Sequence, residues 1–469
     1  MNKAMVRING VTINNFKNVV NGSISFENNR KNYKSSVLGL YGQNGSGKTA
    51  LIDSLELLKI VLTGNQIPLK FSDYVNIDAD YSLIEYDLKI ENTDSKALYD
   101  VVYKFKIKKE NDFSSQNIDD IVGNKYKTVI YDEILSCSFT GENEKNKLMP
   151  IIDTSNNSEY PFEPKNKFEC LIGSDKKVVN DVKAYKTITY HTSRSFIFSR
   201  ELLTIIRQNE SDKKYKFLLE SLVNYGNYEL FVFNTTSNGL ISMNALPLSF
   251  RINEENTKAV GGLMIKLDGP TFVPEDALNI VKKVISNMNI VLTQIVPGLT
   301  IGIKEIGDVV LKDNRTGKSI YLVSSKNGKE IPLKYESDGI KRIISILQLL
   351  IVLYNNSTIT VAIDELDSGV FEYLLGEILK IISEKGKGQL IFTSHNLRPL
   401  ETIDKGFVAF TTTNPNNRYI RFTNVKTNNN LRDFYYRDII LGEQSEKVYE
   451  ETNNYEIALA FKEAGEYRL

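Results

Sequence analysis

The chain has 469 residues, and its 58 Lys and Arg side chains are balanced by 58 Asp and Glu, so the formal net charge is zero. This balance excludes a uniformly basic nucleic-acid coat and an acidic disordered chain. At about 150 residues per domain, the length corresponds to three domains or to one large α/β unit with insertions. A content of 41% hydrophobic residues is enough to bury a sizeable core.

The beginning of the chain shows strand-like patterns followed by a helix. Residues 11–13 and 24–26 alternate, and residues 37–41 form an apolar run typical of a strand buried on both faces. Leucines then recur at spacings of three and four from residue 51 to residue 62, which predicts a helix. Alternation at a period of two predicts an antiparallel set of strands at 81–90, 98–108 and 128–139.

The middle of the chain is mixed, with helices predicted at 200–207, 215–223 and 274–295. The last third alternates helix and strand, which predicts a parallel sheet flanked by helices: 340–354, 358–363, 371–383 and 389–393. We therefore predict a discontinuous α/β core. Its parts are residues 1–140 and 300–425, with a mostly helical regulatory insertion at 141–299 and a C-terminal helical tail at 426–469.

Cysteine and histidine are scarce, with two residues of each. Cys137 and Cys170 do not form a Cys-x-x-Cys pair, which argues against a disulfide framework and a cysteine-based zinc site. No signal-peptide pattern is present at the N-terminus, and the longest apolar stretch, 343–354, is shorter than the roughly 20 residues of a membrane span. We expect a cytoplasmic protein with no membrane segment.

The strongest motif lies between the strand predicted at 37–41 and the helix that follows it. Gly42-Gln43-Asn44-Gly45-Ser46-Gly47-Lys48-Thr49 fits G-x-x-x-x-G-K-S/T at every position. Such a loop binds phosphates through inward-facing backbone N–H groups and the N-terminal end of the helix. Lys48 would reach the β- and γ-phosphates, and the Thr49 hydroxyl would bind Mg²⁺. The alternative is a glycine-rich surface turn. The residues that we expect to bind the nucleotide here are Asn44, Gly45, Ser46, Gly47, Lys48, Thr49 and Ala50.

An acidic pair, Asp364-Glu365, ends the apolar strand predicted at 358–363. In phosphate-loop enzymes the acid at such a strand end holds Mg²⁺, so Asp364 is the expected metal ligand. Glu365 would orient or deprotonate the attacking water. Without the phosphate loop, two exposed carboxylates at a strand end would be the simpler interpretation.

His395 follows the next predicted strand, at the edge where ligands bind in parallel α/β sheets. A neutral imidazole there could hydrogen-bond the γ-phosphate or the attacking water, so we predict a catalytic role. The alternative is a histidine packed in a loop. His191 has no comparable context and is expected to be structural.

A capped helix start marks a second candidate site, at Ser337-Asp338-Gly339. Ser337 has the features of an N-cap, and Gly339 leaves a backbone N–H open to approach. Lys341 and Arg342 oppose the helix dipole, so an anion docked at this end would explain them. An ordinary capped helix is the alternative.

Together these motifs resemble ABC-type ATPase heads, in order and in type. Asn15-Phe16-Lys17, the phosphate loop, Ser337–Gly339, Asp364-Glu365 and Ser394-His395 follow one another as in that superfamily. The nearer resemblance is to SMC/RecF-like proteins and to small AAA-labelled bacterial ATPases of the OLD and abortive-infection kind. It implies a P-loop NTPase fold of ABC-ATPase type with a mixed sheet, flanking helices and an antiparallel β subregion.

The resemblance also implies an ATP sandwich with ATP and Mg²⁺ as cofactors. Two copies would dimerise, each nucleotide lying between the phosphate loop of one copy and Ser337 and Gly339 of the other, with Lys17 near the nucleotide. This sequence departs from the family in having Ser-Asp-Gly where Ser-Gly-Gly is usual. The loop after Asp364-Glu365 is altered as well. The Mg²⁺-sensing glutamine is not placed, since Gln66 and Gln116 are both candidates.

The expected function is an ATP-dependent switch, working as a homodimer or larger homo-oligomer. By resemblance it would sense phage infection and control a separately encoded nuclease or toxin. Two alternatives stay open: a RecF/SMC-like clamp on duplex DNA, which the zero net charge disfavours, and an assembly scaffold with little turnover. Nucleic acid is a possible ligand.

Two features of the tail have competing interpretations. Aromatic and basic side chains interleave at residues 432–437 and could stack on nucleic acid, but we expect the aromatics to pack into the core. The helix predicted at 455–464 has an apolar stripe. We expect it to dock on its own domain, with binding to a partner as the alternative.

Overall fold

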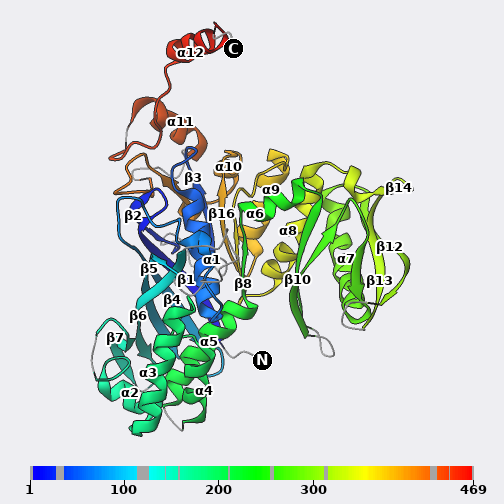
Figure 1. Ribbon diagram of the computed structural model, residues 1–469. Coiled ribbons are helices and arrows are strands. Elements are labelled where there is room, and N and C mark those ends of the chain that lie inside the picture. The colour runs from blue at the N-terminus through cyan, green and yellow to red at the C-terminus, as the bar shows by residue number, and fades with distance from the viewer. Residues whose placement is uncertain are drawn as a thin grey trace.

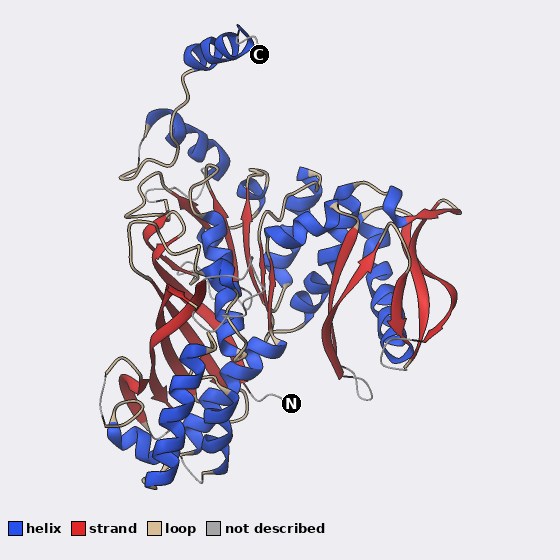
Figure 2. Ribbon diagram, viewed as in Figure 1, coloured by secondary structure: helices blue, strands red, loops and turns tan. Residues whose placement is uncertain are grey.

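The computed structural model describes residues 4–27, 36–112, 126–142, 144–156, 159–209, 212–253, 258–310, 315–422, 430–442 and 444–466. Two six-stranded sheets form the main body, and a smaller lobe of strands and helices stands beside the second sheet (Figures 1 and 2). No helix among these residues is long and apolar enough to cross a membrane.

The first sheet is antiparallel, with strand order β2-β1-β4-β5-β6-β7. Side chains of β4 alternate between buried and partly exposed, so the period-two prediction for residues 81–139 is confirmed. Its strands are β1 (Ala4–Phe16), β2 (Val19–Ser25), β4 (Ser82–Asn92), β5 (Leu98–Asn111), β6 (Tyr126–Thr140) and β7 (Lys145–Asp153). The helices beside it are α2 (Lys165–Ile172), α3 (Lys176–His191), α4 (Arg200–Gln208) and α5 (Lys213–Tyr228).

The second sheet has strand order β18-β17-β3-β16-β15-β8, and all its pairs are parallel except β17 with β18. The predicted parallel sheet flanked by helices is therefore confirmed. Its strands are β3 (Ser36–Tyr41), β8 (Leu230–Phe233), β15 (Thr360–Ile363), β16 (Gln389–Ser394), β17 (Val408–Thr411) and β18 (Tyr419–Ile420). The helices that follow or flank these strands are α1 (Lys48–Leu62), α8 (Asp338–Asn355), α9 (Glu372–Lys385) and α10 (Pro399–Thr402).

Both sheets draw strands from the segment that we expected to be a separate insertion at 141–299. β7 extends the first sheet, and β8 pairs with β15 in register, Leu230 opposite Thr360. The expected boundaries therefore do not separate an insertion from the core, because an edge strand of each sheet comes from this segment.

The smaller lobe is built from the described residues between 235 and 332. It holds the hairpin β9 (Ala245–Asn253) and β10 (Lys258–Lys266), and a sheet with the order β11-β13-β12 in which β14 also pairs with β13. Helix α7 packs on β12 and β13, and α8 packs on β9. The remaining bounds are α6 (Thr235–Ser242), β11 (Thr271–Pro274), α7 (Glu275–Ile295), β12 (Leu299–Val310), β13 (Thr316–Lys326) and β14 (Lys329–Pro332).

Helix α1 lies between the two main sheets and joins them. It contacts β1 of the first sheet and β8, β15 and β16 of the second, and Tyr86 of β4 donates a 2.5 Å hydrogen bond to the carbonyl of Ser54. Burial therefore extends beyond the predicted leucine stripe to Ile52, Leu57 and Val61. A helix enclosed in this way holds its N-terminal end, and the phosphate loop before it, in a fixed position.

The tail divides into a packed part and an exposed part. Phe434 and Tyr435 of α11 (Leu431–Leu441) are buried, and Tyr435 stacks on Phe410 with ring centroids 5.0 Å apart. The prediction that the aromatics of residues 432–437 pack into the core is confirmed for Phe434 and Tyr435 and is wrong for Tyr436, which is 46% exposed. The prediction that the last helix docks on its own domain is wrong: residues 454–465, in α12 (Asn454–Glu466), are all exposed, and the helix stands clear of the body (Figure 1).

Candidate active site

Three neighbouring parallel strands bring the predicted motifs to one edge of the second sheet. β16 lies between β3 and β15, with Ser394 opposite Tyr41 and Phe392 opposite Ile363. The phosphate loop follows β3, His395 follows β16, and Asp364-Glu365 follows β15. Parallel strands place their carboxyl ends at the same edge, so the order β3-β16-β15 assembles the site.

The phosphate loop has a backbone that requires glycine. Gly42, Gly45 and Gly47 all have positive φ, and a Cβ on Gly42 would lie 1.8 Å from the hydroxyl oxygen of Thr411. The Ser46 hydroxyl is buried and hydrogen-bonds both that hydroxyl and the carbonyl of Gln43. The loop is therefore braced from β17, a contact that the motif alone did not predict.

Five other predicted binding residues differ in exposure along this loop. Asn44 and Gly45 are exposed, Gly47 is the left-handed N-cap of α1, Thr49 is half-buried, and Ala50 is buried in the first turn. The exposed and half-buried positions leave backbone and hydroxyl groups accessible to a phosphate chain. Their assignment to the nucleotide remains a prediction.

Lys48 is the charged centre of the loop. The residue is nearly fully buried, and its ammonium donates to the carbonyls of Gly42 and Gln43, each at 2.8 Å. Burial lowers the pKa of Lys48 to about 8, and the negative charge of Asp364 opposes this shift. A buried cation held among backbone dipoles is suited to binding an anionic phosphate chain.

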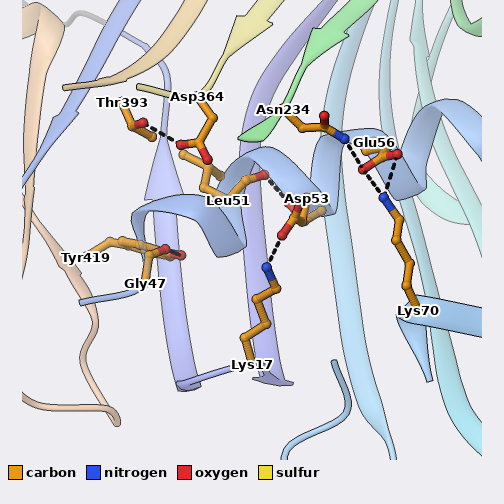
Figure 3. A network of polar contacts seen from close by, with 11 residues as sticks. Lys17, Gly47, Leu51, Asp53, Glu56, Lys70, Asn234, Asp364, Thr393 and Tyr419 are labelled. Carbon is orange, nitrogen blue, oxygen red and sulfur yellow. Dashed lines mark hydrogen bonds and ion pairs between the residues drawn. The ribbon is translucent and has the colours of Figure 1, made fainter. Parts of the chain in front are cut away.

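The acidic pair is fixed by Thr393 of the neighbouring strand. Asp364 is fully buried, and its carboxylate accepts a 2.5 Å hydrogen bond from the Thr393 hydroxyl (Figure 3). The same hydroxyl accepts the Glu365 N–H at 2.8 Å. Glu365 has a φ of 48°, a left-handed conformation that costs a non-glycine residue about 1–3 kcal/mol and is concentrated at functional sites.

The oxygen donors at this edge fit Mg²⁺. No group of three or more His, Cys, Asp or Glu residues in the described part of the chain could hold a metal ion by itself. Mg²⁺ commonly takes only one or two protein oxygens and completes its shell with phosphates and water. The buried carboxylate of Asp364 and the hydroxyl of Thr49 would supply the protein ligands.

His395 is exposed at the rim of the site. Partial burial of the ring and the nearby Lys48 ammonium lower its pKa, which favours the neutral imidazole at physiological pH. Its backbone N–H donates to the carboxylate of Asp367 at 3.0 Å, and the N–H of Asn396 donates to the same oxygen at 2.9 Å. Asp367 therefore holds the loop that carries His395.

The predicted signature lies at the start of α8. Ser337 is the N-cap and accepts the N–H of Ile340 at 3.3 Å. A Cβ on Gly339 would lie 2.0 Å from the carbonyl oxygen of Gly369, in the loop that follows the acidic pair. Close packing within the chain therefore accounts for this glycine, whatever contacts it makes with a nucleotide.

Lys341 and Arg342 have partners within the chain, so no docked anion is needed to explain them. Lys341 pairs with Asp338 at 3.3 Å. Arg342 donates from one guanidinium nitrogen to the carbonyls of Asp364 and Glu365, at 2.9 and 3.2 Å, and lies over the ring of Phe233. Burial lowers the pKa of Arg342 to about 10, and the charge of Glu365 opposes this shift.

The sequence interpretation named Arg342 but missed its role. It links the signature helix directly to the backbone of the acidic pair in the same chain. The sequence did contain a signal, since an arginine inside an otherwise apolar helix face must find a polar partner.

Arg342→Lys is expected to lower ATP turnover about tenfold, equivalent to about 1.4 kcal/mol of barrier, because the lysine side chain ends one bond short of the guanidinium nitrogen that donates to both carbonyls. ATP binding should be unaffected. Steady-state kinetics check this, with Arg432→Lys as a matched change on α11, where the arginine pairs with Glu401. Equal turnover in wild type and Arg342→Lys would show that Arg342 does not position the acidic pair.

Lys17 lies beside α1, one turn beyond the phosphate loop. Its ammonium pairs with Asp53 (Figure 3). The same ammonium lies 4.0 Å from the ring centroid of Tyr74. Burial raises the pKa of Asp53, and the charge of Lys17 opposes that shift. A role for Lys17 at the nucleotide remains a prediction.

The structure describes only one of the two glutamines that are candidates for Mg²⁺ sensing. Gln66 follows the C-terminal end of α1, so the length of that 15-residue helix, about 22 Å, separates it from the phosphate loop. Gln116 lies outside the described residues. His191, at the end of α3, contacts the ring of Tyr190 and is not part of this site.

Comparison with known proteins agrees with this geometry. Residues 6–398 match the family described as an AAA ATPase domain. No curated protein matches the chain.

Similar solved structures include an Smc head bound to the C-winged helix domain of ScpA, with a TM-score of 0.44 and 11% identity over 89% of this chain and 98% of that chain. An SMC head from Thermotoga maritima has a TM-score of 0.36 and 12% identity, covering 89% of this chain and 99% of that one. A structure of the recombination mediator protein RecF has a TM-score of 0.36 and 14% identity, covering 88% of this chain and 98% of that one.

The family match spans most of the chain and includes the phosphate loop, the acidic pair and His395. The expected fold class, a P-loop ATPase with mixed sheets and flanking helices, is confirmed. The chain belongs to the AAA ATPase domain family, and it is an ATPase.

Proposed function

We propose that this ATPase is a molecular switch that works as a head-to-head homodimer. Each ATP would lie between the phosphate loop of one copy and Ser337–Gly339 of the other. The observation that carries the proposal is the exposure of Ser337, which leaves this residue accessible to a second copy. Lys48, Asp364 and His395 meet at one sheet edge, whereas Ser337 is exposed at the start of α8, where it caps its own helix.

The residues at the edge would divide the chemistry among them. Lys48 would bind the phosphates, Glu365 would orient and deprotonate the attacking water, and the neutral ring of His395 would hydrogen-bond the γ-phosphate or that water. Mg²⁺, held by Thr49 and Asp364, would neutralise charge on the phosphates. Catalysis would come from positioning and electrostatics rather than covalent steps.

The biological role that we propose is control of a separately encoded nuclease or toxin during phage infection. Its support is the resemblance of the motif order to abortive-infection ATPases. The alternative, a clamp on duplex DNA, needs a basic surface. The lysine row on the partly exposed face of β5 is paired with acids: Lys104 with Glu85, Lys106 with Asp132 and Lys108 with Glu110. Such pairing leaves little net positive charge for phosphates.

A plaque assay tests this role. Phage is expected to form far fewer plaques on cells that carry the gene with its native neighbouring genes than on cells without it. Lys48→Ala should restore the plaque count to that of cells without the gene. Equal plaque counts with and without the wild-type gene would contradict the defence role, and ATP-dependent, salt-sensitive DNA binding would favour the clamp.

A further inference from the structure

Helix α12 lies exposed at the end of the part of the chain that the structure describes. Residues 454–465 are all exposed, including Phe461 at 77% and Ile457 at 42%. Ile457, Phe461 and Ala464 recur at the i, i+4, i+7 spacing of one apolar face. The Asn453 side chain caps the helix by accepting the N–H of Tyr455 at 3.0 Å.

A helix of this length needs packing to be stable. α12 has 13 residues, and isolated helices shorter than about 12–15 residues are marginal in water. An apolar face at helical spacing, a side-chain cap and full exposure together indicate a helix that is stabilised by an external surface.

The segment before α12 is anchored to the phosphate loop. The Gln43 amide accepts the N–H of Glu450 at 2.9 Å and donates to its carbonyl at 3.4 Å, as a neighbouring strand would. Glu446 accepts from Asn414 and Asn417 at 3.1 and 2.8 Å. The arm, residues 444–466, therefore starts from a fixed point on the nucleotide loop.

The arm and α11 also form one wall of a cavity beside the loop. This cavity has a volume of about 350 Å³ and is lined by Gly42, Gln43 and His395 on one side and by Tyr435, Ile439 and Tyr449 on the other. The chain then leaves the body on this side of the molecule, and α12 lies beyond it (Figure 1).

Exposed aromatic side chains flank the predicted signature. Tyr335 and Phe371 are 68% and 70% exposed, and Tyr373 is 55% exposed. Tyr335 lies two residues before Ser337, and Phe371 follows the loop whose Gly369 touches Gly339. Large exposed aromatics of this kind are typical anchors of protein interfaces.

We infer that α12 docks on a second copy of this chain, beside its signature, where Tyr335, Phe371 and Tyr373 are exposed. The inference rests on the proposed dimer. When two-fold symmetry places the loop of each copy opposite the signature of the other, an arm anchored beside one loop lies beside the signature of the partner. Each copy then contributes a helix to the other, and the anchor at Gln43 links this exchange to the nucleotide loop.

Hydrogen exchange on the full chain tests the inference, in the slowly hydrolysing variant Glu365→Gln. Without ATP, the α12 amides should exchange almost as fast as in an unfolded peptide. With ATP, their exchange should slow at least about tenfold as the helix docks. Molar mass measured on the same samples reports dimerisation, and Lys48→Ala, which should not bind ATP, should show neither change.

A paired variant tests the apolar face. Ile457→Glu together with Phe461→Glu should weaken ATP-dependent dimerisation at least about tenfold, since buried aromatic anchors carry much of the energy of an interface. Both positions are exposed, so folding is unaffected. Glu463→Lys, on the charged face, is the control and should dimerise as the parent does.

The possible results distinguish a failure of the inference from a failure of the proposed function. If Glu365→Gln stays monomeric with ATP, the dimeric switch is wrong and the inference with it. If it dimerises while the α12 amides exchange as fast as before, or while the paired variant dimerises equally well, the helix exchange alone is overturned.

Discussion

Lys48→Ala is expected to weaken ATP binding by about 100-fold or more, equivalent to about 2.8 kcal/mol. Lys48 is nearly fully buried in the loop, where its charge is poorly screened by water. Removing it leaves the phosphate chain without its central cation and leaves the carbonyls of Gly42 and Gln43 without their donor. Isothermal titration with ATP measures the change.

Lys59→Ala is the matched control, since it removes the same charge from the last turn of the same helix. It should bind ATP as wild type does. The pKa of Lys48, about 8, adds a second readout. The affinity of the wild-type protein for ATP should fall about tenfold between pH 7 and pH 9, because binding the anion requires the protonated form of Lys48. Lys48→Arg, which stays charged, should flatten this dependence. Wild-type affinity in Lys48→Ala would contradict the assignment of the phosphate loop.

Glu365→Gln is expected to lower ATP turnover by about 10²–10⁴, the usual contribution of a general base. The amide cannot take a proton from water. It should keep the left-handed backbone, because Thr393 and Arg342 hold that backbone through main-chain atoms. ATP affinity should be unchanged, so single-turnover kinetics at saturating ATP isolate the chemical step.

Glu372→Gln makes the same substitution on an exposed residue in the first turn of α9 and should leave turnover unchanged. Unchanged turnover in Glu365→Gln itself would show that another group activates the water.

Local patterns predicted those parts of the fold that depend on local sequence. Alternation over residues 81–139 gave the antiparallel strands, and the apolar run at 37–41 followed by Gly42–Thr49 gave β3, the loop and α1. Each signal is contained within one element, and each element's burial follows its own periodicity.

What the patterns missed depends on contacts between distant segments. β8 joins the second sheet by pairing with β15, which lies about 130 residues later in the chain. A strand of only four residues carries no sequence signal of the strand with which it pairs. The exposure of α12 was missed because an apolar stripe does not say which surface covers it.

The candidate site shows the same limit. The motifs identified Lys48, Asp364, Glu365 and His395, whose placement at one edge follows from strand order. Arg342 was interpreted from its position at a helix end, whereas its structural partners are the carbonyls of the two residues that follow β15. Partners across a fold are set by packing, which one sequence does not reveal.

Mixing two inactive variants tests the composite site most directly. Ser337→Arg and Lys48→Ala should each hydrolyse no ATP, and neither should unfold. Where the two chains pair, the heterodimer has one intact site, which joins the loop of the Ser337→Arg chain to the signature of the Lys48→Ala chain. Turnover in the mixture is expected to rise well above that of either variant alone, to at most about half of the wild-type value, because one of the two sites stays inactive. A mixture that stays inactive while both chains remain folded would contradict a nucleotide site shared between two copies.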